Sequence, residues 1–448
     1  MIKRIFTLLI AMLAALSGLS AQGFNITLKF SHYVPQKVRL TYFYEDKQYV
    51  QVDSASQSGS TVTFSGDYQL YPGIYSIILD GAKTSFELLI DSLNQNFTMK
   101  CDVNDIQKTA KFTGSDMNAR FFEYQRAMTS IVREQQELDT ARKYHPADSV
   151  RIDKKLSELD SRITDTWKSS VEANKGTFLA DVLNCMKARE FGYDKMFDYV
   201  NFAQKGLIRT PFFYNIIRAH IAHHLNREAH YTEIIRQTDR IMKMAQANLD
   251  VNHYVSGYLL NFYRTFYRLG INEVFVHIAD KYFLESGDRD LSSENRQMIK
   301  TQRDIYAASI PGSDATPIRM CKTITGDSVD VLSNHSGVLF LLFWANGCGH
   351  CDSAENALKY YYDKLLQNNV KVISVNNDKH SISSLKSNTE KKNFPWLDVC
   401  DTEGNSRYRE YYYVCSTPIM YIIDDKNRIL NKVVGEAQIT EVAERFSH

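Results

Sequence analysis

Apolar and polar residues alternate in short segments along the first quarter of the chain. Between residues 24 and 115, the segments FNITLKF, KVRLTYFY and TVTFSG carry an apolar side chain at about every second position. Turn-forming pairs such as Pro72-Gly73 separate segments of this kind. Successive side chains of a strand point to opposite faces of a sheet, so this period indicates strands with one buried face. The pattern predicts a small antiparallel β domain over residues 24–115.

Helical spacing replaces this alternation from residue 116 to residue 309. Prolines almost disappear, and apolar residues recur three and four positions apart, as in YTEIIRQTDRIMKMAQANL and VSGYLLNFYRTFYRL. Such spacing places apolar side chains on one face of a helix. The region therefore predicts an all-α domain of about eight helices, since a helix averages about 11–12 residues.

Strand and helix patterns alternate after a segment typical of a linker, IPGSDATPIRM. GVLFLLFW is apolar throughout, which is typical of a strand buried on both faces. A helical pattern follows, then KVISVNND as a strand and PIMYIIDDKNRILNKVVG as a hairpin. The alternation predicts an α/β domain over residues 312–448, so we expect a multidomain protein.

The first 21 residues have the composition of an export signal. Lys3 and Arg4 precede a mostly apolar run, and Ser20-Ala21 supplies the small residues typical of a cleavage site. The run is short and polar sequence follows it directly, which argues against a stable membrane span. We interpret residues 1–21 as a cleaved signal peptide, with an uncleaved anchor as the alternative.

Charge and cysteine content narrow the possible functions. The formal net charge is +1, which argues against a nucleic-acid binder, because such proteins usually carry a strong basic excess. Seven cysteines at scattered spacings do not form the framework of a disulfide-stapled exported domain. One close pair remains, Cys348 and Cys351.

The close pair lies where the predicted buried strand passes into a helix, in FWANGCGHC. A helix begins with unpaired N–H groups and the positive end of its dipole, so a thiol there loses its proton more readily. We expect Cys348 to attack a disulfide and Cys351 to resolve the mixed disulfide. Gly349 would keep the approach to the sulfur open. A protonated His350 would stabilise the Cys348 thiolate and make the pair a better oxidant.

A metal site is the main alternative for the cysteine pair. Structural zinc needs four ligands, commonly two CxxC pairs or one with paired histidines. The chain has no second CxxC, and His380 is isolated. In AHIAHHLNREAH, His220 and His224 share a helix face, but the segment, which ends at His230, lacks the HExxH pattern. We therefore expect no metal, and no cofactor beyond the redox-active Cys348–Cys351 pair.

The C-terminal region resembles the thioredoxin-like family, and within it the exported bacterial thiol-disulfide oxidoreductases of the TlpA type. FWANGCGHC is similar to the family's F-W-A-x-x-C-x-x-C, and residues 412–418, YYVCSTP, are similar to its Y-x-V-x-x-T-P. The resemblance covers about residues 312–448. The β region, which ends in FTGSDMN, and the helical region resemble uncharacterised domains of exported thioredoxin-like proteins from Bacteroidetes.

The resemblance implies a substrate site around the two cysteines. Pro418 would be a cis proline, and the backbone of Thr417 would pair with the substrate chain as an added strand. Trp344 and Gly349 are also expected at this site. The implied partners are protein thiols and disulfides, with an upstream redox protein that resets the pair. The implied location is the periplasm or the cell envelope.

The sequence also departs from the family. Thioredoxins carry a buried acid six residues before the first cysteine, where this chain has Leu342. CGHC is the tetrapeptide of protein disulfide isomerases, which are less reducing than thioredoxins, so the direction of exchange stays open. Cys415 would be either a regulatory or resolving thiol or an inert one. The alternative function is an envelope adaptor in which the thioredoxin fold serves mainly for docking a partner.

Overall fold

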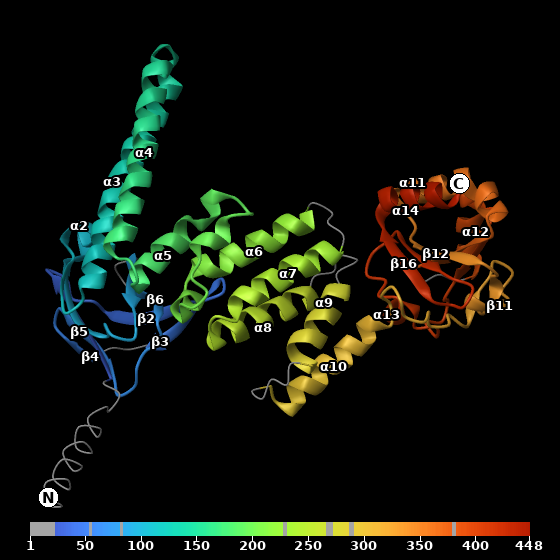
Figure 1. Cartoon of the computed structure of the whole chain (residues 1–448), viewed down its shortest axis with the longest axis horizontal. Helices are drawn as coiled ribbons and strands as arrows, with labels where there is room; N and C mark the ends of the chain where they lie inside the picture. The colour runs from blue at the N-terminus through green and yellow to red at the C-terminus, as the bar shows by residue number, and fades with distance from the viewer. Residues whose placement is uncertain are drawn as a thin grey trace, which may run out of the picture. The chain divides into compact units, whose positions relative to one another are not determined.

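The computed structural model describes residues 23–52, 56–80, 84–226, 231–265, 272–285, 291–378 and 382–448 (Figure 1). The described residues divide into two compact units. The first contains those up to Asn226 together with Lys243–Tyr254, and the second contains those of Arg227–Met242 and of Val255–His448. This division falls inside the helical region, so the boundaries near residues 115 and 310 stay predictions. The expected signal peptide, residues 1–21, lies outside the described residues.

The predicted β region forms two sheets in the first unit. One has the strand order β4-β5-β1-β8-β9 and contains β1 (Phe24–Ser31), β4 (Ser56–Ser58), β5 (Thr61–Gly66), β8 (Asn96–Asp102) and β9 (Lys111–Thr113). The other has the order β3-β2-β6-β7 and contains β2 (Lys37–Tyr44), β3 (Lys47–Val52), β6 (Gly73–Asp80) and β7 (Thr84–Ile90).

Alternation along these strands produces buried and exposed faces, as predicted. In β1, the side chains of Phe24, Ile26, Leu28 and Phe30 are buried and the residues between them are not. Most strand pairs are antiparallel, but β1 and β8 pair in parallel. This parallel pair was not predicted, and it arises because the chain passes through the other sheet as β6 and β7 before it returns as β8.

The helical region begins at Ser115, whose side chain caps the first turn by accepting a hydrogen bond from the Asn118 amide. Helices α3 and α4 run side by side in Figure 1. Within the described residues, the α-helices up to residue 307 are α2 (Ile106–Thr109), α3 (Asp116–Tyr144), α4 (Ser149–Ala173), α5 (Phe178–Lys187), α6 (Pro211–Asn226), α7 (Tyr231–Ala245), α8 (Leu249–Thr265), α9 (Asn272–Ile278) and α10 (Ser293–Ala307). No helix of the described residues combines the length and the apolar composition that a membrane span requires.

The C-terminal region folds around one mixed sheet with the strand order β11-β10-β14-β13-β12-β15-β16. One of its inner strands, β12, pairs in parallel with β13 and antiparallel with β15. The strands are β10 (Cys321–Lys322), β11 (Ser328–Val329), β12 (Val338–Trp344), β13 (Val370–Asn376), β14 (Leu397–Cys400), β15 (Ile419–Ile423) and β16 (Ile429–Val434). The helices are α11 (Gly349–Gln367), α12 (Ile382–Lys392), α13 (Tyr408–Tyr411) and α14 (Gly435–Phe446).

Strand β12 is apolar throughout because both faces of the sheet are covered. Leu339, Leu341 and Phe343 point into one hydrophobic cluster, which includes Tyr408 of α13. Phe340, Leu342 and Trp344 point into the opposite cluster, which α11 and α14 complete (Figure 1). A strand covered on both faces reads as a continuous apolar run. The predicted buried strand is confirmed.

Helices α9 and α10 pack against this sheet within the second unit. The Lys432 side chain, on β16, is only 1% exposed, and its Nζ lies 3.6 Å from Oε1 of Glu273. Nζ also donates a hydrogen bond to Oδ1 of Asn272. The rings of Tyr306 and Tyr413 meet edge to face, with centroids 4.6 Å apart. We call these five residues the seam.

Candidate active site

A strand, a tight turn and a helix position the two cysteines. Strand β12 ends at Trp344, and α11 begins directly after Cys348. Between them Gly347 has a φ of +71°, in the left-handed region where only glycine is comfortable. The turn therefore directs the chain from β12 into a helix whose first residue follows the first cysteine.

Cys348 is the N-cap of α11. Its Sγ accepts a hydrogen bond from the backbone N–H of Cys351 at 3.2 Å, which satisfies one of the unpaired donors of the first turn. The residue is half-buried, so the sulfur faces both the helix end and solvent. The Cys351 N–H and the positive end of the α11 dipole both lie next to this sulfur. Cys348 is therefore the more accessible of the two cysteines, and its role as the attacking nucleophile stays a prediction.

Cys351 lies one turn into the helix and is fully buried among the apolar side chains below the sheet surface. Burial raises the pKa of its thiol to about 12. The two cysteines thus differ in exposure, since Cys348 is half-buried and Cys351 is fully buried.

The segment around Thr417 lies against the Cys348 sulfur. Strand β15 pairs with β12, with Ile419 opposite Phe343, and this brings the preceding residues beside the cysteines. The Thr417–Pro418 peptide bond is cis. The carbonyl oxygen of Thr417 lies 3.6 Å from Sγ of Cys348, and its Oγ1 lies 3.9 Å from the same sulfur. Among the described residues, the Thr417 N–H has no hydrogen-bond partner, so it can pair with an added strand.

His350 lies at the surface, with its side chain 79% exposed. Its Nδ1 is 3.1 Å from Oε2 of Glu436, in the first turn of α14. Within the described part of the chain, this carboxylate is its hydrogen-bond partner, and no interaction joins the ring to the Cys348 sulfur. The predicted influence of His350 on that sulfur therefore competes with an ion pair that sequence reasoning did not foresee.

Trp344 occupies the core rather than the surface. Its side chain is fully buried, and its Nε1 donates a hydrogen bond to Oδ1 of Asp398 at 2.9 Å. The indole therefore has no exposed surface with which to contact a client. The expected substrate contact through this side chain is corrected, and the physical reason is the apolar cluster that covers this face of β12.

Asp398 is a buried acid that sequence reasoning missed. Besides the indole, Ser374 and Thr389 donate hydroxyl hydrogen bonds to its carboxylate, at 2.6 and 2.7 Å. Burial raises the pKa of Asp398 to about 6, against the lowering effect of these donors. The one available signal was an acid inside the apolar strand LDVC.

Glu355 is a second buried acid, and it lies four residues after Cys351 on the same side of α11. Its side chain is 1% exposed, and Lys392 approaches Oε2 at 2.7 Å while also bonding Asp352. Burial raises the pKa of Glu355. Leu342, six residues before Cys348, is fully buried and apolar.

The other predicted candidates do not gather into a site. Across the residues that the structure describes, no group of three or more His, Cys, Asp or Glu could hold a metal ion. His220 and His224 lie together, with ring centroids 4.7 Å apart, but His230 and His380 lie outside the described residues. Cys415 is exposed and lies three residues before Pro418.

Comparison with protein-family models assigns two parts of the chain. Residues 336–429 match a thioredoxin-like family, and residues 24–121 match a domain of unknown function, DUF4369. No curated protein matches the chain.

Three of the solved structures similar to this chain come from Bacteroides. The thioredoxin domain of a thiol-disulfide oxidoreductase from Bacteroides vulgatus is 20% identical, with a TM-score of 0.28, and the match covers 31% of this chain and 98% of that one. A thioredoxin-like protein from Bacteroides caccae is 15% identical, with a TM-score of 0.41, and the match covers 59% and 92%. A thiol:disulfide interchange protein from Bacteroides sp. is 20% identical, with a TM-score of 0.29, and the match covers 31% and 91%. The chain therefore combines an N-terminal DUF4369 domain with a C-terminal thioredoxin-like domain that carries Cys348 and Cys351.

Proposed function

We propose that the protein is an exported thiol-disulfide oxidoreductase that exchanges disulfides with protein substrates through Cys348 and Cys351. One observation carries the proposal. The accessible sulfur of Cys348 caps α11, lies above the buried Cys351, and is 3.6 Å from the backbone carbonyl of Thr417. A nucleophile, a resolving thiol and an unpaired backbone edge for the client meet at one place.

The exchange balances as two thiol-disulfide steps. The Cys348 thiolate attacks one sulfur of the client disulfide, so that bond breaks and a mixed disulfide forms. The second client sulfur leaves as a thiolate and takes up a proton. Cys351 then loses its proton and attacks the Cys348 sulfur, which releases the client dithiol and leaves a Cys348–Cys351 disulfide. Two electrons have moved to the client, and the reverse sequence oxidises a client dithiol.

Completion of the cycle needs a partner that resets the pair. For client reduction, the reset is an exchange with the dithiol of an upstream redox protein, which supplies two electrons. Export would place these reactions outside the cytoplasm, in the periplasm or cell envelope, and rests on the pattern of residues 1–21. Fractionation of cells that express the full chain tests this part, and protein retained with the cytoplasmic fraction would contradict it.

Gly349 and Thr417 have separate roles in this proposal. A Cβ added at Gly349 would meet no heavy atom within 4 Å, so open space lies next to the attacking sulfur. The backbone of Thr417 pairs with the client strand and orients its disulfide toward Sγ. Pro418 holds the segment against the end of β12.

Substitution of the attacking cysteine tests the proposal. Cys348→Ser should reduce exchange with a protein disulfide to the uncatalysed rate, and Cys351→Ala should accumulate mixed disulfides with clients. Cys415→Ser is the matched control, because Cys415 is an exposed thiol of the same domain. Exchange retained within about twofold would identify Cys415 as an inert surface thiol, and a larger loss would assign it the regulatory or resolving role. Equal exchange by Cys348→Ser and the parent would support the adaptor alternative instead.

A further inference from the structure

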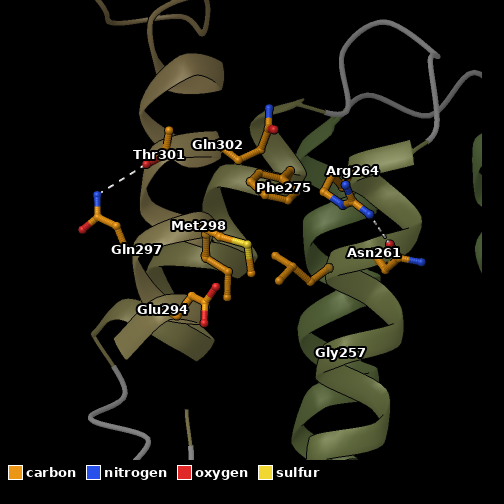
Figure 2. A pocket seen from close by; sticks show the side chains of 11 residues that line it. Gly257, Asn261, Arg264, Phe275, Glu294, Gln297, Met298, Thr301 and Gln302 are labelled. Carbon is orange, nitrogen blue, oxygen red and sulfur yellow. Dashed lines mark hydrogen bonds between the residues drawn. The ribbon is translucent and has the colours of Figure 1, made fainter. Parts of the chain in front are cut away.

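A groove lies between α8 and α10 in the second unit (Figure 2). Its volume is about 810 Å³, within the range of roughly 300–1,000 Å³ that ligand-binding clefts occupy. Figure 2 shows Phe275 at one end of the groove, with Met298 of α10 below it. The groove belongs neither to the cysteine site nor to the hydrophobic clusters of the C-terminal sheet.

The lining of the groove suits a polypeptide with apolar side chains. Leu260 and Met298 provide apolar surface beside the buried Phe275, and the Met298 residue is 58% exposed despite its large apolar side chain. Methionine is unbranched and polarisable, so it adapts to side chains of different shapes. Asn261 and Gln302 add amide groups that can bond a peptide backbone. Exposed apolar surface beside polar groups is typical of interaction sites.

Two side chains of opposite charge line the groove. Figure 2 shows Arg264 of α8 and Glu294 of α10 on opposite sides of the apolar lining. The Arg264 guanidinium donates to Asn261, but neither charged group forms an ion pair with any residue that the structure describes. An acidic side chain at the Arg264 side and a basic one at the Glu294 side would complement these charges.

A row of aromatic rings connects the groove with the client-binding segment. Phe275 meets Tyr306 at 5.0 Å between centroids, and Tyr306 meets Tyr413 at 4.6 Å. Tyr413 lies four residues before Thr417, a span of at most about 14 Å. The groove floor is therefore within roughly 25 Å of the Thr417 backbone, which an extended segment of about eight residues can bridge.

We propose that this groove binds an apolar segment of the client polypeptide, flanked by an acidic and a basic residue, while the client disulfide reacts at Cys348. The inference rests on the proposed function and names the class of substrate, which is an extended or unfolded protein chain. The segment would lie about eight residues from the reacting cysteine in the client sequence.

Gly257 offers a way to fill the groove without disturbing the fold. It lies in the middle of α8, and a Cβ added there would meet no heavy atom within 4 Å. Glycine inside a helix is less favourable than alanine by about 1 kcal/mol, so a substitution should not weaken α8. Gly257→Phe would place a ring in the groove, and Gly257→Ala is the matched control.

The binding test uses the full chain with Cys348→Ser and a fluorescent peptide that contains no cysteine. The peptide has an apolar centre between one acidic and one basic residue, and anisotropy measures its Kd. Gly257→Phe should weaken binding at least tenfold, and Gly257→Ala should leave it within about twofold. Arg264→Glu should weaken binding as well. Both sides of the groove are then acidic, so a peptide whose two flanking residues are both basic should recover the affinity.

Equal affinity of the Gly257→Phe and Gly257→Ala proteins would overturn the proposal. The proposal would also be overturned if sedimentation showed that the parent chain is a dimer and that Gly257→Phe converts it to a monomer, because a second copy would then occupy the groove. Because the Cys348→Ser protein carries out no exchange, this binding result is independent of whether the oxidoreductase proposal holds. With Cys348 intact, Gly257→Phe should lower kcat/KM for the disulfide-bearing peptide and spare a small aromatic disulfide.

Discussion

Cys348 and Lys432 lie in the same domain but in opposite surroundings. Around Cys348, the neighbouring His350–Glu436 pair is solvent-exposed at both partners. At the seam, Lys432 and Glu273 are both buried, and burial lowers the pKa of Lys432. Separating an exposed ion pair costs little free energy of unfolding, whereas leaving a buried charge without its partner costs several kcal/mol, about 3–5. The comparison teaches that the charged contact next to Cys348 can separate at little cost, whereas the contact that holds α9 to β16 cannot.

Removing the acid of the seam should have the largest effect. Glu273→Leu leaves Lys432 buried without its carboxylate, so the free energy of unfolding should fall by about 3–5 kcal/mol. Replacing both partners, as Glu273→Leu with Lys432→Met, should restore most of that loss, since an apolar pair of similar volume is often as stable. Urea unfolding measures both variants. A loss below about 1 kcal/mol in the single variant would show that the two regions do not differ as described.

Asp398, which accepts a hydrogen bond from Trp344 at the end of β12, should give the second-largest effect, seen as a pH dependence of the unfolding free energy. Its pKa is raised from 3.8 to about 6 in the folded protein, so between these values folding takes up a proton. The contribution of Asp398 to the unfolding free energy is therefore fully present below about pH 4. It is lost as the pH rises through about 6, and the total loss is about 3 kcal/mol. Asp398→Asn lacks this dependence. Urea unfolding from pH 4 to 7 measures both proteins. As the pH rises, the parent should lose stability relative to Asp398→Asn, and a difference that stays constant would contradict the assignment.

The hydroxyl pair of the seam should contribute less. The Tyr413 hydroxyl donates to that of Tyr306 at 3.3 Å, and Tyr306 in turn donates to the Arg264 carbonyl at 3.3 Å. A hydrogen bond of this kind is worth about 0.5–1.5 kcal/mol net. A double-mutant cycle of Tyr306→Phe and Tyr413→Phe should therefore give a coupling of about 1 kcal/mol. Additive losses would mean that the rings, and not the hydroxyls, hold the seam.

The solvent-exposed pair of His350 and Glu436 should contribute least to the unfolding free energy. Glu436→Gln removes the partner of His350, and because both side chains are solvent-exposed the unfolding free energy should change by less than about 1 kcal/mol. A thermal melt at low and high salt provides the check. A loss as large as that of Glu273→Leu would erase the contrast between the two regions.

Sequence patterns predicted the reacting part of the fold closely. The apolar run before Cys348 forms β12, the helical pattern after it forms α11, and the predicted hairpin forms β15 and β16. These elements depend on local periodicity and on a covered sheet, both of which the sequence displays. The match to a thioredoxin-like family over residues 336–429 confirms the predicted resemblance.

The groups that sequence reasoning missed depend on contacts between distant segments. Lys432 and Glu273 meet only because α9 packs on β16, and neither residue has a local pattern that announces its partner. Asp398 is an isolated acid in a short strand until Trp344, Ser374 and Thr389 surround it. For the same reason, Trp344 was expected at the client surface, although the covering helices bury it.

The sulfur of Cys348 caps the first turn of α11 through the Cys351 N–H, and it is also the atom that we propose reacts with clients. When that sulfur forms a mixed disulfide, its lone pairs meet the Cys351 N–H in a different geometry. Each exchange therefore alters the hydrogen bond that caps α11. Folding free energy and oxidation state are then linked through a single atom, and a calorimeter could follow the redox cycle with no reporter attached.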